Sequence, residues 1–194
     1  MRSKIQSVIE NSIAIKQSIL KDELLLDQVE SIIQACVGCF REKGKVLFCG
    51  NGGSAADAQH LAGEFSGRFY IDREPLFAEA LHVNTSFLTA VANDYSFDEV
   101  YARMVRGMGQ VGDLLFAMST SGNSPNVLRA AEDAKNRGMK VIAMTGASGG
   151  KLKEQCDWLL NIPSSDTPRI QECHMLLGHI ICEEVERRVF KPAL

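Results

Sequence analysis

The spacing of hydrophobic positions changes once along this chain, after residue 43. Residues 3–43 carry apolar side chains at helical intervals, for example Ile32, Cys36 and Phe40, and such positions build one face of a helix. The polar pair Lys21-Asp22 interrupts the pattern. The N-terminal part is therefore predicted to form two consecutive helices.

Beyond residue 43, short apolar runs alternate with longer segments of helical periodicity. The runs have the length and content of buried strands, and we expect strands at residues 45–49, 77–81, 113–118, 139–145 and 158–162. Helices are expected between and after them, near residues 54–65, 86–92, 97–108, 124–137 and 168–190. This alternation predicts an α/β fold, a doubly wound parallel sheet with helices on both faces.

Length and composition narrow the class of protein. The 194 residues are 45% hydrophobic and 23% charged, as expected for one domain with a sizeable core. We place that domain at 1–194, with N-terminal helices at 1–43 and an α/β core at 44–190. A net charge of −3 offers no basic surface to nucleic acid. No run reaches the roughly 18 apolar residues of a membrane span, and the start lacks an apolar signal core. We therefore expect no membrane contact and a cytoplasmic location.

The six cysteines do not predict a disulfide framework in a chain of this size and acidity. Cys36 and Cys39 form a C-x-x-C motif, but they lie in a helical pattern without a second pair or a nearby histidine. A buried apolar role is favoured over metal or redox chemistry.

The segment Ser-Thr-Ser-Gly-Asn-Ser at 119–124 follows an apolar run and precedes Pro125. Ser124 is a strong helix N-cap and Pro125 suits the first helical position. Four hydroxyls therefore meet the free N–H groups and the positive end of a helix, where a phosphate is favoured. The loop has no lysine and no nucleotide P-loop pattern. The alternative is a serine-rich turn with a good cap.

A second loop, Gly50-Asn-Gly-Gly-Ser-Ala55, fits the dinucleotide fingerprint G-x-G-x-x-A. That function needs an acidic residue at the end of a second strand about 20 positions later, and Asp72 and Glu74 fall in a polar loop instead. The favoured interpretation is that Ser54 caps the next helix in a capping box with Asp57. Asn51 and the glycine amides would then face a polyol.

Candidate chemical groups lie on two predicted helices. His60 and Glu64 are four residues apart and share a helix face, which suits zinc or an acid–base pair but also a plain surface contact. The last helix carries Gln171, Glu172, His174 and His179, and a lone histidine in such a helix is more often a core or interface residue. Asn93-Asp94 closes an apolar helical stretch, where it suits binding of hydroxyls or a simple turn.

Five segments taken together resemble one family. They are Cys-Gly-Asn-Gly-Gly-Ser (49–54), Ala-x-His-x-Ala-x-Glu (58–64), Ala-Asn-Asp (92–94), Ser-Thr-Ser-Gly-Asn-Ser (119–124) and Arg-Ile-Gln-Glu-x-His (169–174) with His179. Each is weak alone, but in this order, from about residue 20 to 190, they resemble the bacterial phosphoheptose isomerases, or sedoheptulose 7-phosphate isomerases, of the sugar isomerase (SIS) superfamily.

The resemblance implies a homotetramer that converts sedoheptulose 7-phosphate to D-glycero-D-manno-heptose 7-phosphate, the first step of ADP-heptose synthesis for the lipopolysaccharide core. It implies one Zn²⁺ per subunit, with ligands at His60, Glu64, Gln171 and His179. Glu64 and His179 also match the family's acid–base residues. The positions matching its substrate contacts are Asn51, Gly52, Gly53, Glu64, Asn93, Asp94, Ser119, Thr120, Ser121, Ser124 and Gln171. Some members carry an aspartate where this chain has Pro168, so any contact through that side chain is absent.

The chemistry agrees with these residue types. Ketose isomerisation through an enediol moves one proton between carbons, which suits a carboxylate such as Glu64, and one between oxygens, which suits an imidazole such as His179. Gln171 and His179 are eight positions apart, about 12 Å along a straight helix, so we expect a symmetric interface between copies to complete the site.

Two related functions use the same fold without catalysis. One is a regulator that binds the replication initiator, and the other is a sugar-phosphate sensor. As the family is known, such regulators lack the carboxylate that corresponds to Glu64. The presence of Glu64 here favours the enzyme.

Overall fold

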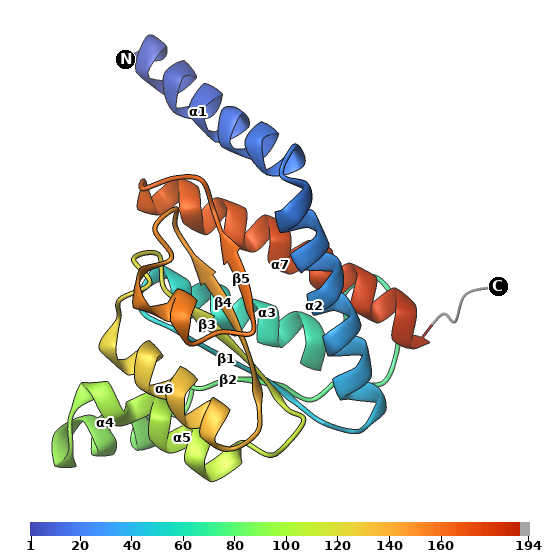
Figure 1. The fold of residues 1–194 in the computed structure, drawn as a ribbon, viewed down its shortest axis with the longest axis vertical. Coiled ribbons are helices and arrows are strands. Elements are labelled where there is room, and N and C mark those ends of the chain that lie inside the picture. The colour runs from blue at the N-terminus through green and yellow to red at the C-terminus, as the bar shows by residue number, and fades with distance from the viewer. Residues whose placement is uncertain (191–194) are drawn as a thin grey trace.

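The computed structural model describes residues 1–190 (Figure 1). Its long helices are α1 (Arg2–Leu20), α2 (Glu23–Arg41), α3 (Gly53–Ser66), α4 (Thr85–Asp94), α5 (Val100–Met108), α6 (Pro125–Asn136) and α7 (Thr167–Phe190). Two short 3₁₀ helices are η1 (Phe97–Glu99) and η2 (Gly150–Glu154). The strands are β1 (Val46–Gly50), β2 (Ala78–Ala80), β3 (Leu114–Met118), β4 (Lys140–Thr145) and β5 (Trp158–Asn161). The elements expected from the sequence are confirmed, with ends that differ by a few residues.

The five strands form one parallel sheet in the order β2-β1-β3-β4-β5. The chain builds outward from β1 to β2 on one side, then returns to place β3 on the other side of β1. This reversal is the topological switch point, and ligands of such sheets bind at the carboxyl ends of the two strands beside it. Both loops singled out in the sequence, after β1 and after β3, lie there.

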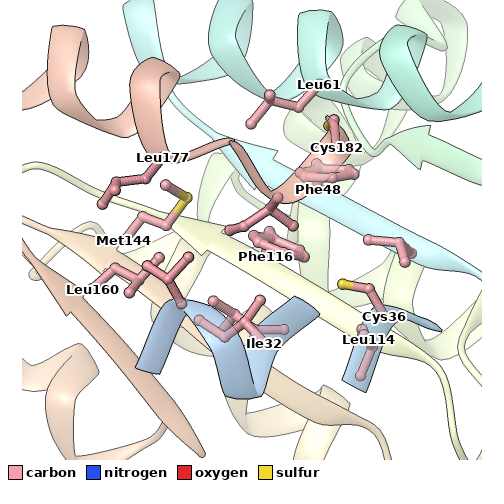
Figure 2. Close-up of a cluster of buried hydrophobic side chains, with 14 of the residues drawn as sticks. Ile32, Cys36, Phe48, Leu61, Leu114, Phe116, Met144, Leu160, Leu177 and Cys182 are labelled. Carbon is pink, nitrogen blue, oxygen red and sulfur yellow. The ribbon is translucent and has the colours of Figure 1, made fainter. Parts of the chain in front are cut away.

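Alternate strand residues build two apolar layers, because successive side chains point to opposite faces of a sheet. One layer joins β-strand residues such as Phe48 and Phe116 to α2, α3 and α7, and these two rings stack with centroids 4.8 Å apart. Figure 2 shows Leu61 of α3 and Leu177 of α7 converging on this layer. Truncating such a buried side chain typically costs about 2–5 kcal/mol. The layer therefore fixes the two helices that carry His60 and His179.

The opposite layer is built by the intervening strand residues, such as Leu47, Leu115 and Val141, packed against α4, α5 and α6. Figure 1 shows these three helices together on the side of the sheet away from α2 and α7. Helices thus cover both faces, which confirms the doubly wound architecture.

The first helix stands apart from the rest of the molecule. Its second half contacts the body through the buried residues Ile15 and Ile19, while its first half projects outward (Figure 1). Helix α1 ends at Leu20 with Lys21 as its C-cap. Asp22 then caps α2 by accepting a hydrogen bond from the N–H of Leu25 at 3.0 Å. The predicted break between the N-terminal helices is confirmed.

Cys36 and Cys39 are buried in the α2 layer as free thiols, and burial raises the pKa of both. This confirms their apolar role. None of the helices within residues 1–190 combines the length and the apolar content required to cross a lipid bilayer.

Candidate active site

The loop after β1 opens α3 through glycine. Gly52 has a φ of 58° and occupies the N-cap position, a conformation that disfavours other residues. The helix therefore begins at Gly53, and Ser54 is already in its first turn and buried. The expected capping box is wrong: no side chain caps α3, and Asp57 Oδ2 is buried without a hydrogen-bond partner within the described chain.

Asn51 connects this loop to the helix that follows the second loop. Its amide exchanges two hydrogen bonds with the amide of Asn126, of 2.8 and 2.9 Å. The Tyr101 hydroxyl donates to the carbonyl oxygen of Gly50 at 2.6 Å and lies 3.3 Å from Asn51 Oδ1. Because Asn126 lies in the first turn of α6, these contacts set the separation of the two loops.

The second loop gathers hydroxyls at the start of α6. Ser119 Oγ lies 2.9 Å from Ser124 Oγ and 3.4 Å from Ser121 Oγ. Ser124 is the N-cap residue and Pro125 the first helical residue, as predicted, but the Ser124 hydroxyl faces Ser119 and does not cap the helix. Within residues 1–190, the N–H groups of Thr120, Ser121 and Ser124 have no intramolecular acceptor. Hydroxyls, free amides and the helix dipole together form a cradle for an anion.

Gly122 fits this cradle against a third loop, Gly146–Gly150. It has a φ of 67°, and a Cβ built there would lie 2.1 Å from the carbonyl oxygen of Gly149. Hydrogen bonds from Gly146 N in the third loop to Thr120 O, and from Leu152 N in η2 to Gly122 O, tie this region to the cradle. A glycine is therefore required at position 122.

Three chemically active side chains converge between α3 and α7. His60 Nε2 lies 2.9 Å from His179 Nε2 and 3.1 Å from Glu64 Oε1. At 2.9 Å one ring nitrogen donates and the other accepts, which requires at least one neutral imidazole. The ligand atoms of the three residues all lie within 4.8 Å of one another. Beside them is an open hollow of about 510 Å³ lined by Ala56, Gln59, His60, Gly63 and Glu64.

The donor set of this cluster, two imidazole nitrogens and a carboxylate oxygen, fits a divalent ion such as zinc. Both ring nitrogens and the carboxylate point to one place, and solvent reaches His60, whose side chain is 49% exposed. The same groups also suit proton transfer.

Gln171, the fourth expected ligand, lies elsewhere on α7. Its amide rests on the start of α3, where a Cβ at Gly53 would come within 2.3 Å of Gln171 Nε2. The two helices run parallel, since Gly178 in turn lies against Leu61. Because α7 is one continuous helix, Gln171 is about 12 Å from His179 along it. A single chain therefore gathers three of the four residues.

Three further residues of α7, His174, Glu172 and Pro168, have roles in the structure of the fold. His174 is fully buried, with Nε2 3.1 Å from the carbonyl oxygen of Thr145, and burial lowers its pKa to about 4. This confirms the core role expected of a lone histidine. Glu172 pairs with Arg169 and accepts a hydrogen bond from Ser12. Pro168 occupies the first turn of α7, where proline is tolerated.

Asn93 and Asp94 close α4, as the sequence suggested. Both are exposed, and Asn93 Nδ2 donates to Asp94 Oδ1 at 2.9 Å. No hydrogen bond within the described residues joins them to either loop or to the histidine cluster. Their contact with a ligand stays a prediction.

A buried ion pair between Arg73 and Glu186 was not found from the sequence. Its Nε–Oε2 distance is 2.8 Å, and both side chains are 2% exposed. Burial alone would raise the pKa of Glu186, but bonds from three backbone N–H groups and from Arg73 lower it below the usual value. In the sequence, Glu186 lies in a run of charged residues, a pattern typical of a solvent-exposed helix face. Only its spacing of seven from His179, two helical turns, could have placed it on the same side of α7.

Comparison with known proteins of similar sequence identifies a single family. The model of the SIS domain family matches residues 9–146. The phosphoheptose isomerase of Mycobacterium tuberculosis (strain ATCC 25177 / H37Ra) is 52% identical over 187 residues, covering 96% of this chain and 95% of the relative. That of Burkholderia pseudomallei (strain K96243) is 49% identical over 194 residues, covering 98% of each.

Solved structures extend this similarity to three dimensions. A phosphoheptose isomerase from Neisseria gonorrhoeae superposes with a TM-score of 0.90 at 43% identity, over 95% of this chain and 98% of that one. Another from Francisella tularensis gives a TM-score of 0.91 at 38% identity, over 95% and 97%. The chain therefore belongs to the phosphoheptose isomerase family of SIS-domain proteins.

Proposed function

We propose that this protein converts sedoheptulose 7-phosphate to D-glycero-D-manno-heptose 7-phosphate, the entry step to ADP-heptose for the lipopolysaccharide core. The observation that carries the proposal is the convergence of Glu64, His60 and His179 in a solvent-accessible cluster. A sugar-phosphate sensor needs an anion cradle but has no use for a carboxylate and two imidazoles at bonding distance. Family membership at about 50% identity supports the same activity.

The phosphate is assigned to the cradle at residues 119–124, and Asn51, Gly52 and Gly53 of the first loop are assigned to the polyol part of the substrate. Ser119, Ser121 and Ser124 supply hydroxyls, and the N–H groups of Thr120, Ser121 and Ser124 have no acceptor within the described residues. A phosphate dianion gains from the positive end of α6 as well. Fixing this end of the sugar orients its carbonyl end for proton transfer.

Glu64 is assigned the carbon proton. Its Oε1 faces His60, which leaves its second oxygen to take a proton from C1 of the ketose and return it to C2. The electron pair of the C1–H bond forms the C1=C2 bond of the enediol, while the C2 carbonyl oxygen accepts its proton from His179, which regains one from O1. His179 is assigned the transfer between oxygens, from O1 to O2, so that the aldehyde forms at C1. General acid–base groups of this kind contribute about 10²–10⁴ each.

We further propose that one Zn²⁺ per chain is held by His60, Glu64 and His179, with Gln171 as the fourth ligand. When bound, such an ion supplies Lewis-acid stabilisation of negative charge on the substrate oxygens, typically several kcal/mol. The donor types and their mutual distances support this assignment. Histidine must be neutral to ligate, so binding should weaken below about pH 6.

A second copy of the chain completes the site in this proposal. Gln171 is about 12 Å from His179, and His60 is seven residues, about 10 Å, along α3 from the first loop. Either gap is too long for one compact site on a single chain. The exposed apolar side chains of α1, Ile5, Ile9 and Ile13, support association of copies, for which a homotetramer is proposed. The cytoplasm is proposed as the compartment.

Direct assay tests the activity. Purified protein incubated with sedoheptulose 7-phosphate is expected to produce an aldoheptose phosphate, detected by the NMR signals of its anomeric protons. Unphosphorylated sedoheptulose is the matched control, and its turnover should be far slower because it cannot use the cradle. Absence of aldose from an active-site-intact, zinc-supplied preparation would overturn the assignment.

Metal analysis tests the ion. Protein prepared without chelator is expected to carry up to one zinc per chain, to lose activity with a strong chelator and to regain it with Zn²⁺. The variant His60→Gln should lose the metal while Gln59→Ala, its neighbour in the same hollow, retains it. A fully active preparation without metal would leave these residues as acid–base groups alone.

A further inference from the structure

Glu186 organises the segment that follows α3. Its carboxylate accepts hydrogen bonds from three successive backbone N–H groups, those of Phe69, Tyr70 and Ile71, at 2.9, 2.7 and 2.9 Å. It also accepts the Arg73 Nε–H bond at 2.8 Å. Three consecutive amides bound to one buried carboxylate fix the local backbone, since each N–H would otherwise lack a partner.

Arg73, the other member of the ion pair, binds the C-terminal end of α3. Its guanidinium donates to the carbonyl oxygens of Glu64 at 2.9 Å, Phe65 at 2.7 Å and Gly67 at 3.2 Å. The last carbonyl groups of a helix have no partner within it, and a cation there is favoured by the helix dipole. The planar fork of arginine can serve several acceptors at once, which a lysine cannot.

These contacts reach two proposed catalytic residues, Glu64 through its backbone and His179 through the ring of Phe69. Arg73 binds the backbone of Glu64 itself. The segment held by Glu186 places the Phe69 ring beside the imidazole of His179, with ring centroids 5.7 Å apart. Glu186 and His179 both lie on α7. The Arg73–Glu186 pair therefore connects α7 to the end of α3 and to the ring of Phe69.

We propose that Arg73 and Glu186 are positioning residues for the isomerase reaction, which hold Glu64 and His179 at the separation that proton transfer requires. This inference rests on the proposed function. Loss of a purely structural ion pair would change only the stability of the fold. Loss of a positioning pair would also lower the rate of the chemical step, because a displacement of about 1 Å can reduce a rate a hundredfold.

Two conservative variants test the inference. Arg73→Lys keeps the charge but loses the fork, and Glu186→Gln keeps the shape but loses one strong acceptor. Each should lower kcat at least tenfold at a temperature where the variant is fully folded. The Kd for inorganic phosphate should stay within twofold of wild type, because the cradle is on other elements. Phe69→Leu changes the segment that Glu186 binds and should lower kcat severalfold. It provides the test if Arg73→Lys and Glu186→Gln do not fold.

A second buried ion pair gives the matched control. Lys45 Nζ lies 2.6 Å from Asp113 Oδ2, with side chains 10% and 2% exposed. These residues directly precede β1 and β3, at the opposite end of the strands from the two loops. Asp113→Asn makes the same chemical change as Glu186→Gln. It should lower the Tm but leave kcat unchanged.

The imidazole NMR signals provide a readout that does not need activity. The chain has four histidines, so the signals can be assigned with single variants. Arg73→Lys and Glu186→Gln should shift the ring signals of His60 and His179 but not those of His82 and His174, and Asp113→Asn should shift none. Wild-type kcat with unshifted signals would overturn the inference, as would equal losses of kcat and phosphate affinity. If the wild-type protein isomerises no heptose phosphate, the proposed function fails and the ring signals alone decide the inference.

Discussion

The imidazole of His174 is enclosed by the fold, and its pKa of about 4 compares with 6.5 for an ordinary histidine. Between these values the unfolded chain binds a proton that the folded protein excludes. Stability therefore falls as pH falls through this window, by about 1.5 kcal/mol from pH 6.5 to pH 5. Denaturant unfolding at several pH values should show this slope. His174→Gln, which can still donate to Thr145, should flatten it, and an unchanged slope would contradict the assignment.

Single residues also show how far the sequence alone could lead to the site. The pairing of His60 with Glu64 was predictable, because helical spacing places them on one face. His60 and His179 are 119 positions apart in the sequence, and only the family resemblance pointed to their meeting. The Asn51–Asn126 bridge and the Arg73–Glu186 pair were not predicted, because long-range polar pairing leaves no local pattern in a sequence. The proposed substrate contacts of Asn93 and Asp94 stay predictions.

At the scale of secondary-structure elements, the junction of β3 and α6 carries the anion cradle. Ser119 and Ser124 bond each other, and Ser121 Oγ still accepts from Asn123 N, so replacing Ser119 and Ser124 with alanine leaves no hydroxyl without a partner. The double variant should weaken binding of inorganic phosphate at least about tenfold, because each hydrogen bond to a charged group is worth about 1.5–3 kcal/mol. Titration calorimetry measures this.

A matched control uses Ser18 and Ser31, whose hydroxyls, among residues 1–190, bond only the carbonyl groups of their own helices. The Ser18→Ala/Ser31→Ala variant should bind phosphate as wild type does. Equal phosphate affinity in the Ser119→Ala/Ser124→Ala variant would show that the phosphate is held elsewhere.

Most elements could be predicted because parallel strands are buried on both faces and stand out as continuous apolar runs. The start of α3 could not, since Gly52 begins the helix through its own backbone conformation, and the pattern pointed instead to the hydroxyl of Ser54. Packing decides such boundaries, and it depends on residues distant in sequence.

At the scale of the whole molecule, the proposed association of copies is assigned to the projecting half of α1. Ile9 and Ile13 are 54% and 50% exposed and lie four residues apart on one face. Burying such side chains is worth about 1.5–3 kcal/mol each. The variant Ile9→Glu/Ile13→Glu should therefore lower the molar mass in sedimentation equilibrium. Asn11→Glu, on the opposite face of α1, should not, and an unchanged mass in the double variant would remove α1 from the interface.

Proton exchange at the substrate carbon tests whether this protein is an enediol isomerase with Glu64 as its base. In heavy water, the wild-type protein should replace the C1 hydrogen of sedoheptulose 7-phosphate with deuterium, as followed by NMR. Glu64→Gln removes the base and keeps the shape, so the exchange rate should drop on the order of a hundredfold or more with little change in the Tm of metal-free protein. Exchange by Glu64→Gln at the wild-type rate would contradict the mechanism.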